Sequence, residues 1–92
     1  MINNIRLNAE PTAVELLYFH VERPAGGKVN LSWATAAEID NLGFYIYRSP
    51  SMGVDEAERI HFEPATGDSS GHTYAFSDTP GNGSWWYFLS DS

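Results

Sequence analysis

The sequence predicts an all-β sandwich, and three observations lead to that fold class. Short runs rich in β-branched and aromatic residues alternate with clusters of Gly, Pro, Asn, Asp and Ser, which is typical of sandwiches and barrels. Apolar and polar residues alternate within the runs, as they do in strands with one buried face. A content of 42% hydrophobic, 14% aromatic and 18% charged residues favours a packed core over a disordered chain.

Six runs are predicted to be strands. Their ranges are 14–22, 28–34, 44–48, 59–63, 73–77 and 85–90. The fourth is short, and we expect it at the periphery of the fold. The one helix candidate, residues 35–40, is too short to carry weight, and residues 55–59 could form one turn. The 92 residues fit one domain and leave no room for a second.

Period-two alternation divides the aliphatic and aromatic residues between the two faces of the strands. One face carries Val29, Leu31, Trp33, Phe44, Ile46, Tyr74, Phe76, Trp85, Tyr87 and Leu89. The opposite face carries Tyr45, Tyr47, Trp86 and Phe88. We therefore expect the first set to supply the core and the second set to lie outside it.

The net charge of −7 argues against two classes of partner. Five basic residues against twelve acidic ones offer no basic stripe for nucleic acid or for an anionic membrane surface. No apolar run approaches the roughly 20 residues of a membrane helix. The absence of cysteine excludes disulfides and thiolate metal sites.

Residues 1–10 lack the basic start and long apolar run of a signal peptide. The chain is therefore expected either to stay inside the cell or to be a mature or excised form.

Two motifs suggest chemistry but lack the context that the chemistry needs. Residues 67–71 match G-x-S-x-G, yet that motif acts between a strand and a helix of a large α/β sheet, so we interpret it as a polar loop. His20, His61 and His72 are not spaced as metal ligands. We predict no catalytic site, cofactor or metal centre, because no acid, base and nucleophile converge.

Two loops remain candidates for binding or modification. Glu38, Asp40 and Asn41 offer oxygen ligands of the kind that calcium takes, although Asp and Asn also serve as turn residues. Asn82 begins an N-x-S sequence in a predicted loop and is a candidate glycosylation site. The other N-x-S match, at Asn30, lies inside a predicted strand.

Residues 29–49 resemble a fibronectin type III-like module that is common in bacterial surface and secreted proteins. The resemblance rests on the run from Leu31 to Phe44, which reads LSWATAAEIDNLGF, and on the following Ile-Tyr-Arg-Ser. Residues 74–78 and 83–89 look like the fifth and sixth strands of the family. The resemblance covers roughly residues 14–91 and implies an immunoglobulin-like antiparallel sandwich, a location outside the cell or at its surface, and a role in binding, spacing or assembly.

The chain departs from this family at both ends. The family continues past its sixth strand into a seventh, which is missing here, and residues 1–13 precede the match. Ile5 and Leu7 alternate there with polar residues, so this extension is predicted to be an extra strand. The chain is thus divided into an extension, residues 1–13, and a sandwich of six family strands, residues 14–92.

The two departures suggest assembly by donor-strand complementation. A sandwich without its last strand leaves a backbone edge unpaired, which a strand from a neighbouring copy can fill. Ile5 and Leu7 would be the donor residues, and the acceptor groove would be lined by Trp85, Tyr87 and Leu89. Head-to-tail donation that does not close builds a filament.

The outer aromatic residues suggest lateral contacts in such an assembly. The family pairs its third and sixth strands, which would bring Tyr45, Tyr47, Trp86 and Phe88 together on one exposed face. The alternatives are that a local segment covers this face, or that it stacks on sugars. For the whole chain, the alternatives to a filament subunit are an adhesion or spacer module excised from a longer surface protein and a carbohydrate-binding accessory module.

Overall fold

The computed structural model describes residues 4–7, 13–24, 27–39, 41–66 and 70–91. The strands within these ranges are β1 Asn4–Leu7, β2 Ala13–Glu22, β3 Val29–Ile39, β4 Gly43–Ser49, β5 Glu58–Pro64, β6 Thr73–Asp78 and β7 Trp86–Asp91. The described residues form no α-helix, and one short 3₁₀ turn, η1 Val54–Glu56, precedes β5. The fold is all-β, as predicted.

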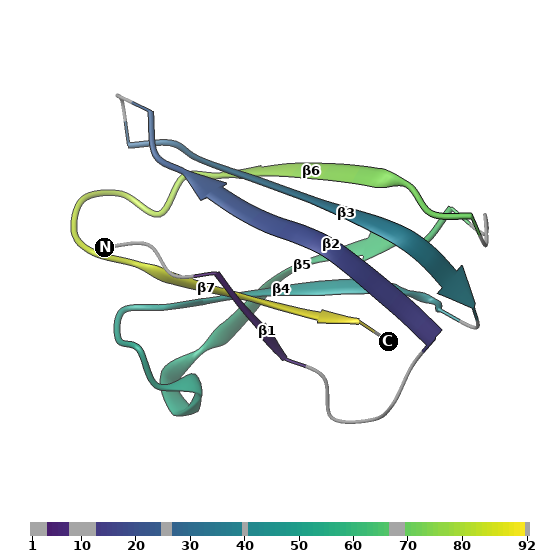
Figure 1. The fold of residues 1–92 in the computed structure, drawn as a ribbon. Helices are drawn as coiled ribbons and strands as arrows, with labels where there is room; N and C mark the ends of the chain where they lie inside the picture. Colours follow the sequence, from purple (N-terminus) through teal and green to yellow (C-terminus); the bar gives the residue numbers. More distant parts are fainter. Residues whose placement is uncertain (1–3, 8–12, 25–26, 40, 67–69, 92) are drawn as a thin grey trace.

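The strands form two sheets that face each other (Figure 1). One sheet has the order β1-β7-β4-β5 and the other has the order β2-β3-β6. All neighbouring strands are antiparallel except β1 and β7, which run parallel. This arrangement is compatible with a β-sandwich, and β5 lies at a sheet edge, in agreement with the expected peripheral position.

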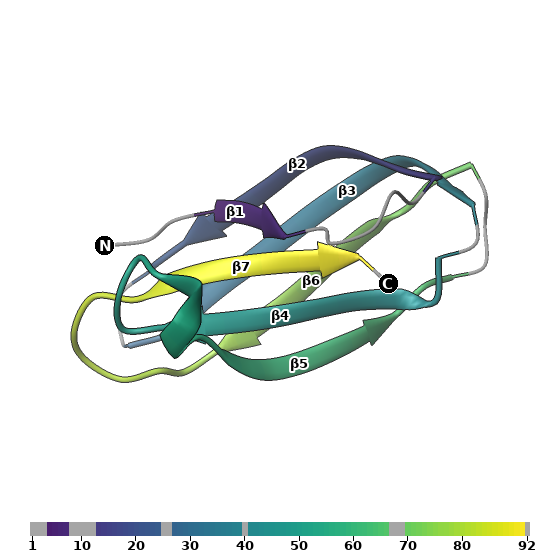
Figure 2. The same ribbon diagram turned by 90° about the horizontal axis from the view of Figure 1, so that it is seen from below.

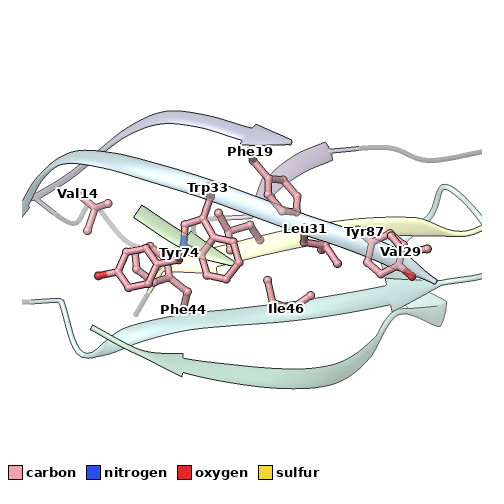
Figure 3. Packing of buried hydrophobic residues seen from close by; sticks show 10 residues of the cluster. Val14, Phe19, Val29, Leu31, Trp33, Phe44, Ile46, Tyr74 and Tyr87 are labelled. Carbon is pink, nitrogen blue, oxygen red and sulfur yellow. The ribbon is translucent and has the colours of Figure 1, made fainter. Parts of the chain in front are cut away.

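Trp33 lies at the centre of the core between the sheets (Figure 3). Its ring packs edge-on against Phe19 and Phe44, with centroids 6.4 Å and 5.7 Å apart, and stacks on Tyr74 at 5.4 Å. Val29, Leu31, Ile46, Tyr87 and Leu89 fill the rest of the interior. The residues that alternation assigned to the core are therefore buried, with Phe76 and Trp85 partly buried against them.

The short helix candidate at residues 35–40 is not a helix in the described residues, because β3 continues as a strand to Ile39. β2 pairs with this part of β3 as far as the partners Ala13 and Ile39. The Thr35 amide also donates to the His72 carbonyl, with an N–O distance of 2.9 Å. Two flanking segments of the same chain thus provide hydrogen-bond partners for the backbone of residues 35–39. A single helical turn would satisfy fewer of these backbone groups.

Close approach between β3 and the segment before β6 requires a glycine at position 71. Gly71 has a φ of 99°, a conformation that favours glycine. A Cβ atom there would also collide with the Thr35 carbonyl oxygen. The His72 amide then donates to Thr35 Oγ1 at 3.1 Å, so the segment is joined to β3 in both directions.

Charged side chains connect several elements near the start of β7. Arg48 Nη1 donates to both carboxylate oxygens of Asp78, at 3.0 Å and 2.8 Å, and the Tyr87 hydroxyl donates to Asp78 Oδ2 at 2.7 Å. Arg23 donates to the carbonyls of Gly81 and Gly83. These bonds tie β4, β6, β7 and the loop before β7 together across the two sheets.

Candidate functional site

The edge of β7 corresponds to the sheet edge that was predicted to accept an additional strand. Tyr87 and Leu89 face the core, and they are 0% and 1% exposed. One edge of β7 pairs with β4, from Ser49 and Trp86 to Phe44 and Asp91. A strand has two edges, so the remaining edge of β7 is the place where an additional strand can bind.

In the structure β1 of the same chain occupies that edge (Figure 2). Asn4 pairs with Tyr87, Ile5 with Phe88, Arg6 with Leu89 and Leu7 with Ser90. β1 also lies next to β2, at the border of the other sheet. The segment predicted to be an extra strand is therefore a strand, and it pairs with β7 of its own chain.

The register of β1 within its own chain pairs Ile5 with Phe88 and Leu7 with Ser90. The polar positions Asn4 and Arg6 are paired with Tyr87 and Leu89. The expected role of Ile5 and Leu7 as donor residues for another copy stays a prediction. Trp85, the third residue predicted to line the acceptor groove, precedes β7. Its ring is partly buried, and the Arg48 guanidinium lies 5.0 Å from the ring centroid.

The expectation that four outer aromatic residues are exposed is wrong for Phe88. This residue is 0% exposed, while Tyr45, Tyr47 and Trp86 are half-buried. The backbone at Phe88 lies between Tyr47 of β4 and Ile5 of β1, so β7 is an interior strand of its sheet. Side chains on an interior strand are covered from both sides by those of the neighbouring strands. The alternation within one strand does not reveal this burial.

The outer face includes two residues that sequence reasoning missed, Phe62 and Arg59 on β5. The Phe62 ring packs against Tyr45 with centroids 4.8 Å apart, and the Arg59 guanidinium lies 4.7 Å from the Tyr45 ring centroid. Phe62 is 39% exposed. The register of β5 against β4, which pairs Tyr45 with Phe62, is the signal that would have identified them, and it depends on tertiary pairing.

Glu38, one of the candidate calcium ligands, is buried in a network of neutral donors. The Tyr74 hydroxyl donates to its two oxygens at 2.9 Å and 2.8 Å, Thr35 Oγ1 donates to Oε2 at 2.5 Å, and Asn41 Nδ2 donates to Oε1 at 3.3 Å. Burial, and then the bond to Glu38, raise the pKa of Tyr74 above its ordinary value of 10.0. Asp40 lies outside the described residues.

The histidines occupy separate places in the fold. His20 is exposed on β2, His61 stacks on Phe76 at 4.0 Å and bonds Glu63 at 2.9 Å, and His72 contacts the edge of Tyr74. Within the ranges that the structure describes, no three His, Cys, Asp or Glu residues gather as metal ligands do.

The two remaining motifs lie in loops. Of the G-x-S-x-G sequence, residues 67–69 lie outside the described residues, and Ser70 is exposed. Asn82 is exposed in the loop before β7, between the two glycine carbonyls that Arg23 binds. No helix in the described part of the chain is long and apolar enough to cross a membrane.

Comparisons with protein-family models, with curated proteins and with solved structures found no match to this chain.

Proposed function

We propose that this chain is a non-catalytic structural module of the fibronectin type III-like kind, located outside the cell, whose copies join by strand exchange. In this assembly Asn4–Leu7 of one copy pairs with the edge of β7 in the next. The observation that carries the proposal is that the edge beside β7 is filled by a short strand, β1, that is about 80 residues away in the sequence.

The strand order supports the fibronectin type III-like assignment. The resemblance implies that the third and sixth family strands are neighbours, and β4 and β7 are paired along their length. β2, β3 and β6 form the other sheet, and in the proposed assignment they are the first, second and fifth strands of the family. β1 then occupies the edge of β7 that the seventh strand of the family would take.

The burial of β7 supports the need for a strand at this edge. Tyr87, Phe88 and Leu89 are all at most 1% exposed, and an unpaired edge beside them would leave backbone donors and acceptors unsatisfied. Backbone hydrogen bonds depend little on side chains, so the same segment of a second copy can make them. Exchange that passes from copy to copy without closing builds a filament.

The test is electron microscopy and size-exclusion chromatography of the untagged protein and of a variant lacking residues 1–10. Both are incubated at high concentration a few degrees below the unfolding midpoint, where local opening of an edge strand is frequent. We expect ordered filaments from the full chain and none from the deletion variant. Circular dichroism checks that the variant is folded, and a synthetic peptide of residues 1–12 should bind it at the vacant edge.

Unchanged assembly after the deletion would contradict strand exchange. Monomers of the full chain under every condition would favour the second candidate, an adhesion or spacer module. The in-chain pairing of β1 with β7 is the observation on which that candidate rests, because a self-filled edge makes a module complete by itself.

A further inference from the structure

We infer that β1, paired with β7 of its own chain, is an autoinhibitory cap that must be released before copies can join. This inference rests on the proposed function and concerns the regulation of the same edge. It predicts a capped monomer as the resting state, and assembly at a rate set by the opening of β1.

The first argument is that two strands compete for one edge. β7 pairs with β4 from Trp86 to Asp91 on one side, and with β1 from Tyr87 to Ser90 on the other. An incoming strand from a second copy needs the backbone groups that β1 already uses. Self-pairing and exchange are therefore mutually exclusive at this position.

The second argument is that the self-paired register matches the sequence pattern only in part. Register is normally specified by placing apolar positions against the buried face, and a shift of one residue exchanges the two faces. Here the apolar position Ile5 is paired with the buried residue Phe88, but Arg6 is paired with the core residue Leu89 and Leu7 with Ser90. A one-residue shift that paired Ile5 with Tyr87 and Leu7 with Leu89 would give both apolar positions a buried partner, so self-pairing leaves a better-matched register unused.

The third argument is that the described ladder between β1 and β7 is short. β1 has four residues and forms a parallel ladder, which is slightly less stable per residue than an antiparallel one. β2 and β3, by comparison, pair antiparallel along ten and eleven residues. Release of β1 can therefore precede unfolding of the sheets.

The test is a disulfide that locks β1 to β7. The chain has no cysteine, and Leu7 and Ser90 are register partners. Neighbouring strands lie about 4.8 Å apart, within the roughly 4.4–6.8 Å between Cα atoms that a disulfide spans. The double variant Leu7→Cys/Ser90→Cys is oxidised as a dilute monomer and then incubated under the assembly conditions, with and without reductant.

We expect an intrachain disulfide, complete loss of polymer in the oxidised sample, and recovery of polymer on reduction to the extent seen with the wild-type chain. The matched control is Asn30→Cys/Ser77→Cys, which links register partners of β3 and β6 in the other sheet and should assemble whether oxidised or reduced. Non-reducing electrophoresis and thiol titration establish which disulfide has formed.

Two results would overturn the cap. Equal assembly by the oxidised and reduced forms of Leu7→Cys/Ser90→Cys would show that release of β1 is not required. Disulfides found only between copies would show that the self-paired strand is not the resting state. Failure of the wild-type chain to assemble at all is a different result, which refutes the proposed function and the cap along with it.

Discussion

Removing the hydroxyl of Tyr74 isolates the contribution of the buried Glu38 network to stability. Tyr74 is 7% exposed and Glu38 is 6% exposed. The substitution Tyr74→Phe keeps the ring that stacks on Trp33 at 5.4 Å and deletes only the donor that reaches both Glu38 oxygens. Glu38 then retains Thr35 and Asn41 as hydrogen-bond donors.

The expected loss follows from the charge of the acceptor. A hydrogen bond to a charged group contributes about 1.5–3 kcal/mol, and a single hydroxyl proton counts as one such bond although it lies near two oxygens. For a domain of this size each kcal/mol lowers the midpoint by about 4–8 °C. We therefore expect the midpoint of thermal unfolding to fall by roughly 6–24 °C, with the far-ultraviolet spectrum unchanged.

Thermal and urea unfolding at neutral pH measure this loss, with Tyr18→Phe as the matched control. Tyr18 is 47% exposed, so removal of its hydroxyl should cost little. Surface substitutions of this kind change the free energy of unfolding by about 0.5 kcal/mol or less. A loss for Tyr74→Phe no larger than that of the control would refute the reasoning, because the network would then contribute nothing net.

Three further outcomes are expected. Phe88→Ala should lower the free energy of unfolding by about 3–5 kcal/mol, because its ring is fully buried. Phe62→Ala should lower it by about 1 kcal/mol or less, because its ring is 39% exposed. Similar losses for the two variants in urea titrations would contradict the burial of Phe88. Gly71→Ala should destabilise by more than about 1 kcal/mol, because it combines a positive φ with a collision against a backbone oxygen; a neutral or stabilising effect on the midpoint would count against the close approach. Burial and hydrogen bonds raise the pKa values of Tyr74 and Tyr87, so their stabilising effect is complete below pH 10 and is lost as the pH rises through the raised values. The unfolding free energy should therefore fall more steeply above pH 10 in the wild-type chain than in Tyr74→Phe, and equal slopes would refute this linkage.

The core was predictable because each strand carries its own pattern. Val29, Leu31 and Trp33 alternate with polar residues, and all three are at most 1% exposed. Tyr87 and Leu89 were assigned to the same interior, and the structure confirms it. Alternation is a local property, so it can be read before any pairing of strands is known.

Errors arose where pairing between distant segments decides the structure. Residues 35–40 were a weak helix candidate and lay outside the predicted strand, but residues 35–39 extend β3 because β2 and His72 supply partners. Phe88 was expected outside and is buried, because β1 and β4 flank β7. Phe62 was overlooked as part of the outer aromatic face, since its position beside Tyr45 depends on the register of β5.

The sequence by itself determined the all-β class, the approximate strand positions and the residues of the core, because side chains alternate with a fixed period of two along any strand. Only the tertiary structure decided which strand lies beside β7, in which direction and in which register. Those choices depend on backbone hydrogen bonds that are nearly independent of side-chain identity, and on contacts between residues about 80 positions apart in the chain. The proposed assembly edge and its cap follow from these pairings.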